Sequence, residues 1–149
     1  MALGTVLITG GSRGIGAATA LECAAKGYDV VITYLEDQVA ARGVVDGVQA
    51  IGRVARAVQG EVCEGADIVG FFDCAATMPA PLVGLVNNAG VIGQRGYVDD
   101  VSPSIWRRVM EVNVIGLMAC AQAAARIMST ANAGQGGVIV NVSSAAATL

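Results

Sequence analysis

Residues 9–16 read TGGSRGIG, directly after the apolar run TVLI at residues 5–8 and directly before an alanine-rich stretch. A strand that ends in closely spaced glycines and continues into a helix is typical of parallel α/β proteins that bind nucleotides. Gly10 permits a turn with positive φ, Gly14 lets phosphate oxygens approach the main chain, and Gly16 lets the helix pack closely on the sheet. The stretch predicts a pyrophosphate site at the helix N-terminus. A glycine-rich turn without a ligand is the alternative interpretation of this motif alone.

The composition fits an α/β protein. The chain of 149 residues is 54% hydrophobic and 14% charged, and it contains 20 glycines. Such a profile is typical of parallel strands that helices cover on both faces, and the length suits one domain over residues 1–149. A net charge of −3 without a basic run argues against nucleic acid or an anionic membrane as a partner. No apolar run is long enough for a membrane span and no signal peptide is recognisable, so we expect a cytoplasmic protein.

The four cysteines are far apart in the sequence and there is no histidine. Cys23, Cys63, Cys74 and Cys120 therefore lack the clustering that a zinc or redox site needs, and we expect them to be buried as small hydrophobic residues. The lack of histidine excludes an imidazole base within this chain.

Apolar runs alternate with helical patterns along the whole sequence. The predicted strands are residues 5–9, 29–34, 53–59, 82–87 and 138–142, and the predicted helices are residues 15–26, 38–52, 67–78 and 103–128. This alternation predicts a parallel sheet with right-handed crossovers. The last helix is apolar nearly all round from residue 112 onward, so we expect it to be covered by the sheet on one face and by a partner helix or subunit on the other.

The end of the second strand bears on the choice of dinucleotide. An acidic residue there would bind the adenosine ribose and repel a 2′-phosphate, but Tyr34 and Leu35 stand in its place. Arg13 in the glycine loop could reach a 2′-phosphate. Glu36 and Asp37 argue the other way, unless they are merely the acids of a helix N-terminus. We therefore favour NADP over NAD.

Three further motifs follow in order: NNAG at residues 87–90, NVIG at residues 113–116 and VIVNVSS at residues 138–144. Together with residues 9–16 they resemble the short-chain dehydrogenase/reductase family, with a general likeness to 3-oxoacyl carrier-protein reductases and sugar dehydrogenases. The resemblance implies a Rossmann-type doubly wound parallel sheet with strand order 3-2-1-4-5. It also implies reversible hydride transfer between a nicotinamide and a small alcohol or ketone, and a homo-oligomer, either a dimer or a tetramer.

The resemblance assigns roles to residues of this chain. The pyrophosphate loop comprises Gly10, Gly11, Ser12, Arg13, Gly14, Ile15 and Gly16; Tyr34 and Leu35 flank the adenosine ribose; Glu61 and Val62 flank the adenine; Asn88, Ala89 and Gly90 line the ribose. Asn113 is implied to bind the water of a proton relay, and Ser144 to bind the substrate oxygen. Glu61 departs from the Asp or Asn that is usual at its position.

The family's Tyr-x-x-x-Lys pair does not occur in this sequence. We therefore expect an N-terminal part of an oxidoreductase, truncated before strands 6 and 7 and catalytically inactive as it stands. We also expect the strand at residues 138–142 to be an exposed apolar edge that is prone to association. A naturally short, non-catalytic dinucleotide-binding module is the alternative. A P-loop nucleotidase is excluded because no Gly-Lys-Ser/Thr occurs.

Overall fold

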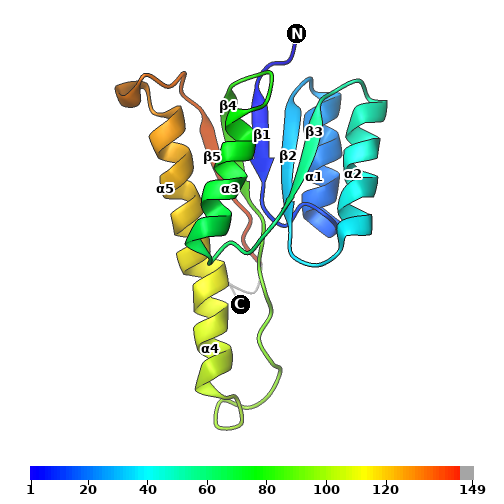
Figure 1. The fold of residues 1–149 in the computed structure, drawn as a ribbon. Helices are drawn as coiled ribbons and strands as arrows, with labels where there is room; N and C mark the ends of the chain where they lie inside the picture. Colours follow the sequence, from blue (N-terminus) through cyan, green and yellow to red (C-terminus); the bar gives the residue numbers. More distant parts are fainter. Residues whose placement is uncertain (145–149) are drawn as a thin grey trace.

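The computed structural model describes residues 1–144 and shows a parallel five-stranded sheet flanked by helices (Figure 1). The strands are β1 (Thr5–Ile8), β2 (Asp29–Tyr34), β3 (Ala55–Gln59), β4 (Leu82–Asn87) and β5 (Val138–Asn141). Their order is β3-β2-β1-β4-β5, and every neighbouring pair is parallel. The predicted fold class and strand order are confirmed. The expectation of one domain over residues 1–149 includes residues 145–149, which lie outside the described residues.

The predicted helices are present within about two residues of their expected ends. They are α1 (Gly14–Ala25), α2 (Gln38–Ala50), α3 (Gly65–Ala76), α4 (Pro103–Met110), η1 (Glu111–Gly116) and α5 (Leu117–Met128), with a short η2 (Thr130–Asn132) before β5. The long final helix is interrupted by the π-helical turn η1, which the sequence pattern did not predict. Together α4, η1 and α5 form one rod whose α4 end projects beyond the sheet (Figure 1).

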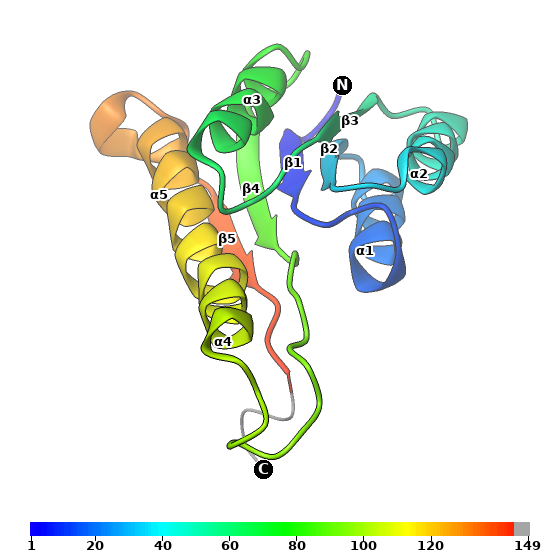
Figure 2. The same ribbon diagram turned by 60° about the horizontal axis from the view of Figure 1, so that its bottom comes forward.

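Two hydrophobic layers hold the sheet between its helices. Side chains alternate along β1, so Val6 and Ile8 join the layer under α1 and α2, whereas Leu7 joins the layer under α3 and α5. Figure 2 shows the two helix layers on opposite sides of the strands. Both β1 and β2 are buried along their whole length, and their polar residues Thr5, Asp29 and Thr33 use their side chains in hydrogen bonds.

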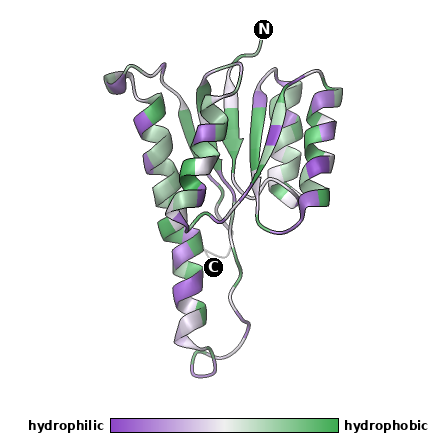
Figure 3. Cartoon of the chain, viewed as in Figure 1, coloured by the Kyte–Doolittle hydropathy of each residue, from purple (hydrophilic) through white to green (hydrophobic). Residues whose placement is uncertain are grey.

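Apolar residues are exposed on β5 and on the long helix. All four residues of β5 are exposed, as expected for an edge strand, and Val138 retains 63% of its accessible surface. Most of β5 is coloured as hydrophobic in Figure 3. The expectation that the long helix is covered on both faces is not met within this chain. Its inner face is packed, but Val114, Ile115 and Met118 on the outer face are exposed.

Hydrogen bonds of two residues explain why the predicted start of the third strand was wrong. Arg53 and Val54 were expected in the third strand, but the main-chain N–H of Arg53 bonds to Val48 O at 3.3 Å and therefore completes the end of α2. The N–H of Val54 bonds to the Asp29 carboxylate at 2.9 Å, before the ladder with β2 begins.

No helix within residues 1–144 is long and apolar enough to cross a membrane.

Candidate nucleotide-binding cleft

The glycine loop adopts the positive φ values that the sequence predicts, +63° at Gly10 and +55° at Gly14. The first two glycines use their main-chain amides within the protein. The N–H of Gly10 donates to Thr33 Oγ1 at 3.2 Å, and the N–H of Gly11 donates to Thr33 O at 2.8 Å. Thr33 therefore fixes the start of the loop to the end of β2, and the amides that can meet a ligand are those further along the loop.

The first turn of α1 follows this anchored part. Its N–H groups at Gly14, Ile15 and Gly16 precede the first bond of the helix, from Ala17 N to Arg13 O at 3.3 Å. Gly16 is packed as expected, because a Cβ built there would lie 2.5 Å from Gly10 O. The positive end of the helix dipole is thus held against the glycine loop, which is an arrangement that suits an anion.

Thr9 joins the glycine loop to the Asn-Asn-Ala-Gly motif. Its hydroxyl oxygen accepts hydrogen bonds from the N–H groups of Asn88 at 3.1 Å and Ala89 at 3.0 Å. In return, the Asn88 side chain donates to the carbonyls of Thr9 and Gly10, both at 3.0 Å. Asn87 is buried and donates to Asn141 Oδ1 at 3.0 Å, which ties β4 to β5. Two motifs far apart in the sequence are therefore one rigid unit at the carboxyl edge of the sheet.

A cleft of about 590 Å³ opens at this edge. Ten of the predicted site residues line it: Gly10, Ser12, Arg13, Tyr34, Leu35, Glu61, Val62, Asn88, Ala89 and Gly90. The sequence assigned no role to five further lining residues: Thr33, Gly60, Val91, Arg108 and Val112. A threonine in a β-branched strand and an arginine on a helix give no local signal of a site, so only the fold reveals them. Gly11, Gly14, Ile15 and Gly16 support the cleft without lining it.

Asn113 does not line the cleft but shapes it. Its Oδ1 accepts the N–H of Val91 at 2.8 Å, and its Nδ2 donates to Val91 O at 2.9 Å. The amide in the π-helical turn therefore clamps the segment that follows Gly90. This explains how a polar residue is tolerated in the middle of an apolar helix. Ser144 is exposed beyond the end of β5 and does not line the cleft either, so the implied catalytic roles of Asn113 and Ser144 stay predictions.

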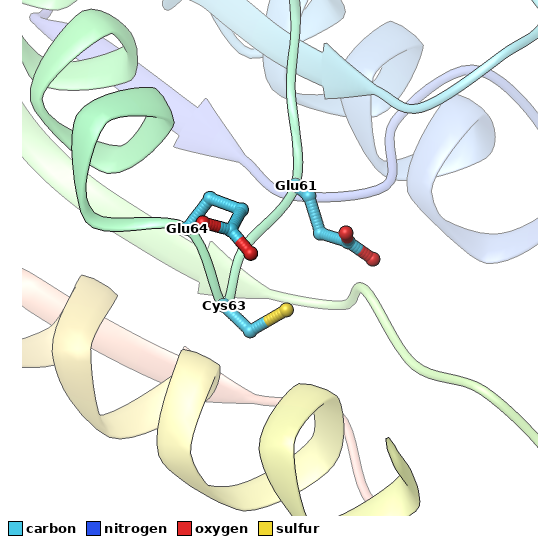
Figure 4. Close-up of side chains that lie close together, drawn as sticks. All are labelled: Glu61, Cys63 and Glu64. Carbon is cyan, nitrogen blue, oxygen red and sulfur yellow. The ribbon is translucent and has the colours of Figure 1, made fainter.

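The far end of the cleft contains an ion pair between Glu61 and Arg108. Arg108 comes from α4 and also donates to Cys63 Sγ at 3.1 Å, and Figure 4 shows Cys63 directed towards this helix. Ligand atoms of Glu61, Cys63 and Glu64 lie within 4.8 Å of one another. A divalent ion there would have to displace the guanidinium. Burial, followed by the charge of Glu64, raises the pKa of the Cys63 thiol, so the thiolate that a metal requires is disfavoured.

The expectation of four buried cysteines was wrong for three of them. Only Cys120 is buried, between α5 and the sheet, and its burial raises the pKa of the thiol to about 11. Cys23, Cys63 and Cys74 are half-buried because each lies at the margin of a helix layer.

Comparison with known proteins identifies the family to which the chain belongs. The family model described as short chain dehydrogenase matches residues 4–149. The chain belongs to the short-chain dehydrogenase family. An uncharacterized oxidoreductase, YgfF, of Escherichia coli K12 is 38% identical over 143 residues, which are 96% of this chain and 58% of that protein. The 3-oxoacyl-[acyl-carrier-protein] reductase of Synechocystis is 34% identical over 144 residues, covering 94% of this chain and 55% of the reductase.

Solved structures of short-chain dehydrogenases share the fold. A short chain dehydrogenase from Burkholderia cenocepacia, in complex with NADP, is 39% identical with a TM-score of 0.86, over 97% of this chain and 57% of that one. An NAD⁺-bound xylitol dehydrogenase is 30% identical with a TM-score of 0.88, over 97% of this chain and 54% of that one. This chain thus spans slightly more than half the length of these relatives, and nicotinamide dinucleotides are bound by proteins of its fold.

Proposed function

We propose that residues 1–144 bind a nicotinamide dinucleotide in the cleft, with the pyrophosphate at the N-terminus of α1. One observation carries this proposal: the glycine loop, the first turn of α1 and the Asn88–Gly90 segment are held together around a cleft at the carboxyl edge of the parallel sheet. Ligands of open α/β sheets bind at this edge, where crossovers on either side diverge. Relatives that bind NADP and NAD⁺ support the same assignment.

Within this proposal the lining residues divide into four groups along the cleft. Ser12 and Arg13 face the phosphates, Tyr34 and Leu35 flank the adenosine ribose, and Asn88 to Gly90 line the ribose near the glycine loop. Glu61 and Val62 flank the adenine. The residues present therefore suit a molecule with an anionic centre and a flat, partly apolar end.

We further propose that NADP is preferred over NAD. Arg13 is exposed and lines the cleft, where its guanidinium can pair with a 2′-phosphate. The Asp37 carboxylate accepts the N–H of Ala40 at 2.9 Å and is therefore engaged as the N-cap of α2. Leu35 offers no acceptor for a ribose 2′-hydroxyl from its side chain.

Calorimetric titration of the chain with NADPH and NADH tests both proposals. We expect saturable binding of both dinucleotides at a stoichiometry of one, with the tighter dissociation constant for NADPH. Absence of binding would contradict the dinucleotide site. If NADH bound more tightly than NADPH, only the role of Arg13 would be contradicted, and the dinucleotide site would stand.

The proposed chemistry of the bound cofactor is hydride exchange with a small alcohol or ketone. The Tyr-x-x-x-Lys pair that supplies the proton in this family does not occur among the 149 residues. We therefore propose that the chain binds the dinucleotide without turning over substrate. Spectrophotometry of NADPH with a panel of small ketones should show no ketone-dependent oxidation, and measurable oxidation would contradict this proposal.

We also propose that the chain self-associates. The exposed apolar residues Trp106, Met110, Val114 and Met118 succeed one another at helical spacing along one face of α4, η1 and α5. A continuous apolar stripe of this kind is typical of an interface. Sedimentation velocity should detect a dimer or tetramer that Met118→Lys converts to monomer, and a monomer at every accessible concentration of the unmodified chain would contradict self-association.

A further inference from the structure

Arg108 crosses from the helix rod to the loop that carries Glu61. One guanidinium nitrogen pairs with Glu61 Oε1, and the other donates to Cys63 Sγ at 3.1 Å. The loop has a second anchor, because the main-chain N–H of Glu61 donates to Asp67 Oδ2 at 2.8 Å. Both the main chain and the side chain of Glu61 are therefore fixed from outside its own loop.

The ion pair holds the Glu61 carboxylate in the lining of the cleft. Arg108 and Glu61 both line the cleft. The guanidinium of Arg108 pairs with this carboxylate at Oε1. A carboxylate oxygen is an acceptor only, so in this position it selects a ligand that presents an N–H donor. The exocyclic amine of adenine is such a donor, whereas the 6-oxo group of hypoxanthine is an acceptor and would be repelled.

We propose that Arg108 is a positioning residue for purine recognition: it holds the Glu61 carboxylate at the adenine end of the cleft, so that the site prefers a 6-amino purine to a 6-oxo purine. The inference rests on the proposed dinucleotide site and adds a residue to it that lies on α4, 47 positions after Glu61 in the sequence. Arg108 acts through Glu61 and does not itself contact the base.

The Arg108–Glu61 ion pair is partly exposed, so its effect on ligand binding can be measured apart from any effect on protein stability. The side chains of Arg108 and Glu61 are 40% and 23% exposed. Ion pairs this close to solvent add little to stability, because solvent screening and side-chain entropy offset the attraction. Replacing Arg108 should therefore leave the thermal midpoint nearly unchanged, while it frees the Glu61 side chain to sample other rotamers.

The test compares NADPH with its hypoxanthine analogue, nicotinamide hypoxanthine dinucleotide phosphate in reduced form, by calorimetric titration of the full chain. Arg108→Met should weaken NADPH binding about tenfold, the size expected for the loss of one charge-assisted hydrogen bond. It should change binding of the hypoxanthine analogue less than about twofold. Arg108→Gln should behave in the same way, and Arg108→Lys should recover part of the preference because it restores a cation.

Two controls test whether Arg108 affects purine preference through Glu61. Arg107→Met removes the neighbouring exposed arginine of α4, which does not line the cleft, and should leave both affinities unchanged. Glu61→Ala should abolish the purine preference, and adding Arg108→Met to it should cause no further loss, since the two residues act as one unit.

The outcomes distinguish the inference from the proposed function. If the unmodified chain binds neither dinucleotide, both are wrong. A second outcome is that the unmodified chain binds both dinucleotides, while Arg108→Met and Arg108→Gln weaken the binding of NADPH and of the hypoxanthine analogue equally. In that case Arg108 contacts the nucleotide directly or merely shapes the cleft. The positioning role is then overturned, whereas the dinucleotide site stands. A purine preference that survives in both variants overturns the inference in the same way.

Discussion

Gly16→Ala is the substitution that probes the glycine loop most sharply. The added Cβ would lie 2.5 Å from Gly10 O, 2.6 Å from Asn88 Nδ2 and 3.0 Å from Gly11 Cα. Two of these three atoms belong to the main chain, and the third already donates to Thr9 O and Gly10 O. None of them can yield without moving the loop or the Asn88 side chain, so the helix must shift outward.

The magnitude follows from two opposing effects. Overpacking of a methyl group in a closely packed site costs about 1–3 kcal/mol. Alanine gains up to about 1 kcal/mol over glycine in a helix interior, and less in the first turn. The net loss of stability should be about 1–2 kcal/mol. Dinucleotide binding should weaken at least about tenfold, because displaced amides lose one or more charge-assisted hydrogen bonds to the pyrophosphate.

Chemical denaturation and calorimetric titration measure the two effects on the same sample. Gly43→Ala in α2 is the matched control, since its Cβ would have no heavy atom within 4 Å, and it should stabilise the chain by up to about 1 kcal/mol with unchanged affinity. If Gly16→Ala matched this control in both stability and NADPH affinity, the close packing of α1 on the loop would have no role in the site.

Three further predictions concern single side chains. Asn113→Ala removes both hydrogen bonds to Val91 and should destabilise the chain by about 1–3 kcal/mol in urea titrations, whereas a change below about 0.5 kcal/mol would contradict the clamp. Arg13→Ala should weaken NADPH binding about tenfold and leave NADH binding nearly unchanged; equal losses for the two dinucleotides would refute its contact with a 2′-phosphate. Burial raises the pKa of Cys120 from 9.0 to about 11, so the folded state favours the neutral thiol. The contribution of the neutral thiol to stability is fully present below pH 9.0 and is lost as the pH rises through about 11. Over this interval the free energy of unfolding should therefore fall more for the unmodified chain than for Cys120→Ala. Parallel pH profiles of the two proteins would contradict the burial effect.

Most of the fold was accessible from the sequence because its signals are local. β2 and β4 were predicted with their observed bounds, since each is an unbroken run of residues that suit a sheet buried on both faces. The π-helical turn at Glu111–Gly116 was not predicted. A π turn differs from an α turn only in which carbonyl each N–H meets, and side-chain periodicity over six residues does not distinguish the two.

The candidate site was predictable where one short segment carries the conformational requirement. The glycine loop needs positive φ at Gly10 and close packing at Gly16, and only glycine meets either need, so the motif is visible in the sequence. Arg108 and Thr33 were missed for the opposite reason. Each contributes through contacts with a segment distant in sequence, and locally Arg108 resembles a solvated residue at the end of a helix.

The central claim is that the amides at the start of α1 bind a dinucleotide's phosphates. Backbone amide spectra of the ¹⁵N-labelled chain, recorded during titration with NADPH, test it residue by residue. We expect the largest shifts at Ser12 to Gly16 and at Asn88 to Gly90, and we expect them to saturate together. Shifts that are absent from these amides, or that are confined to surfaces away from the cleft such as the outer face of α2, would contradict it.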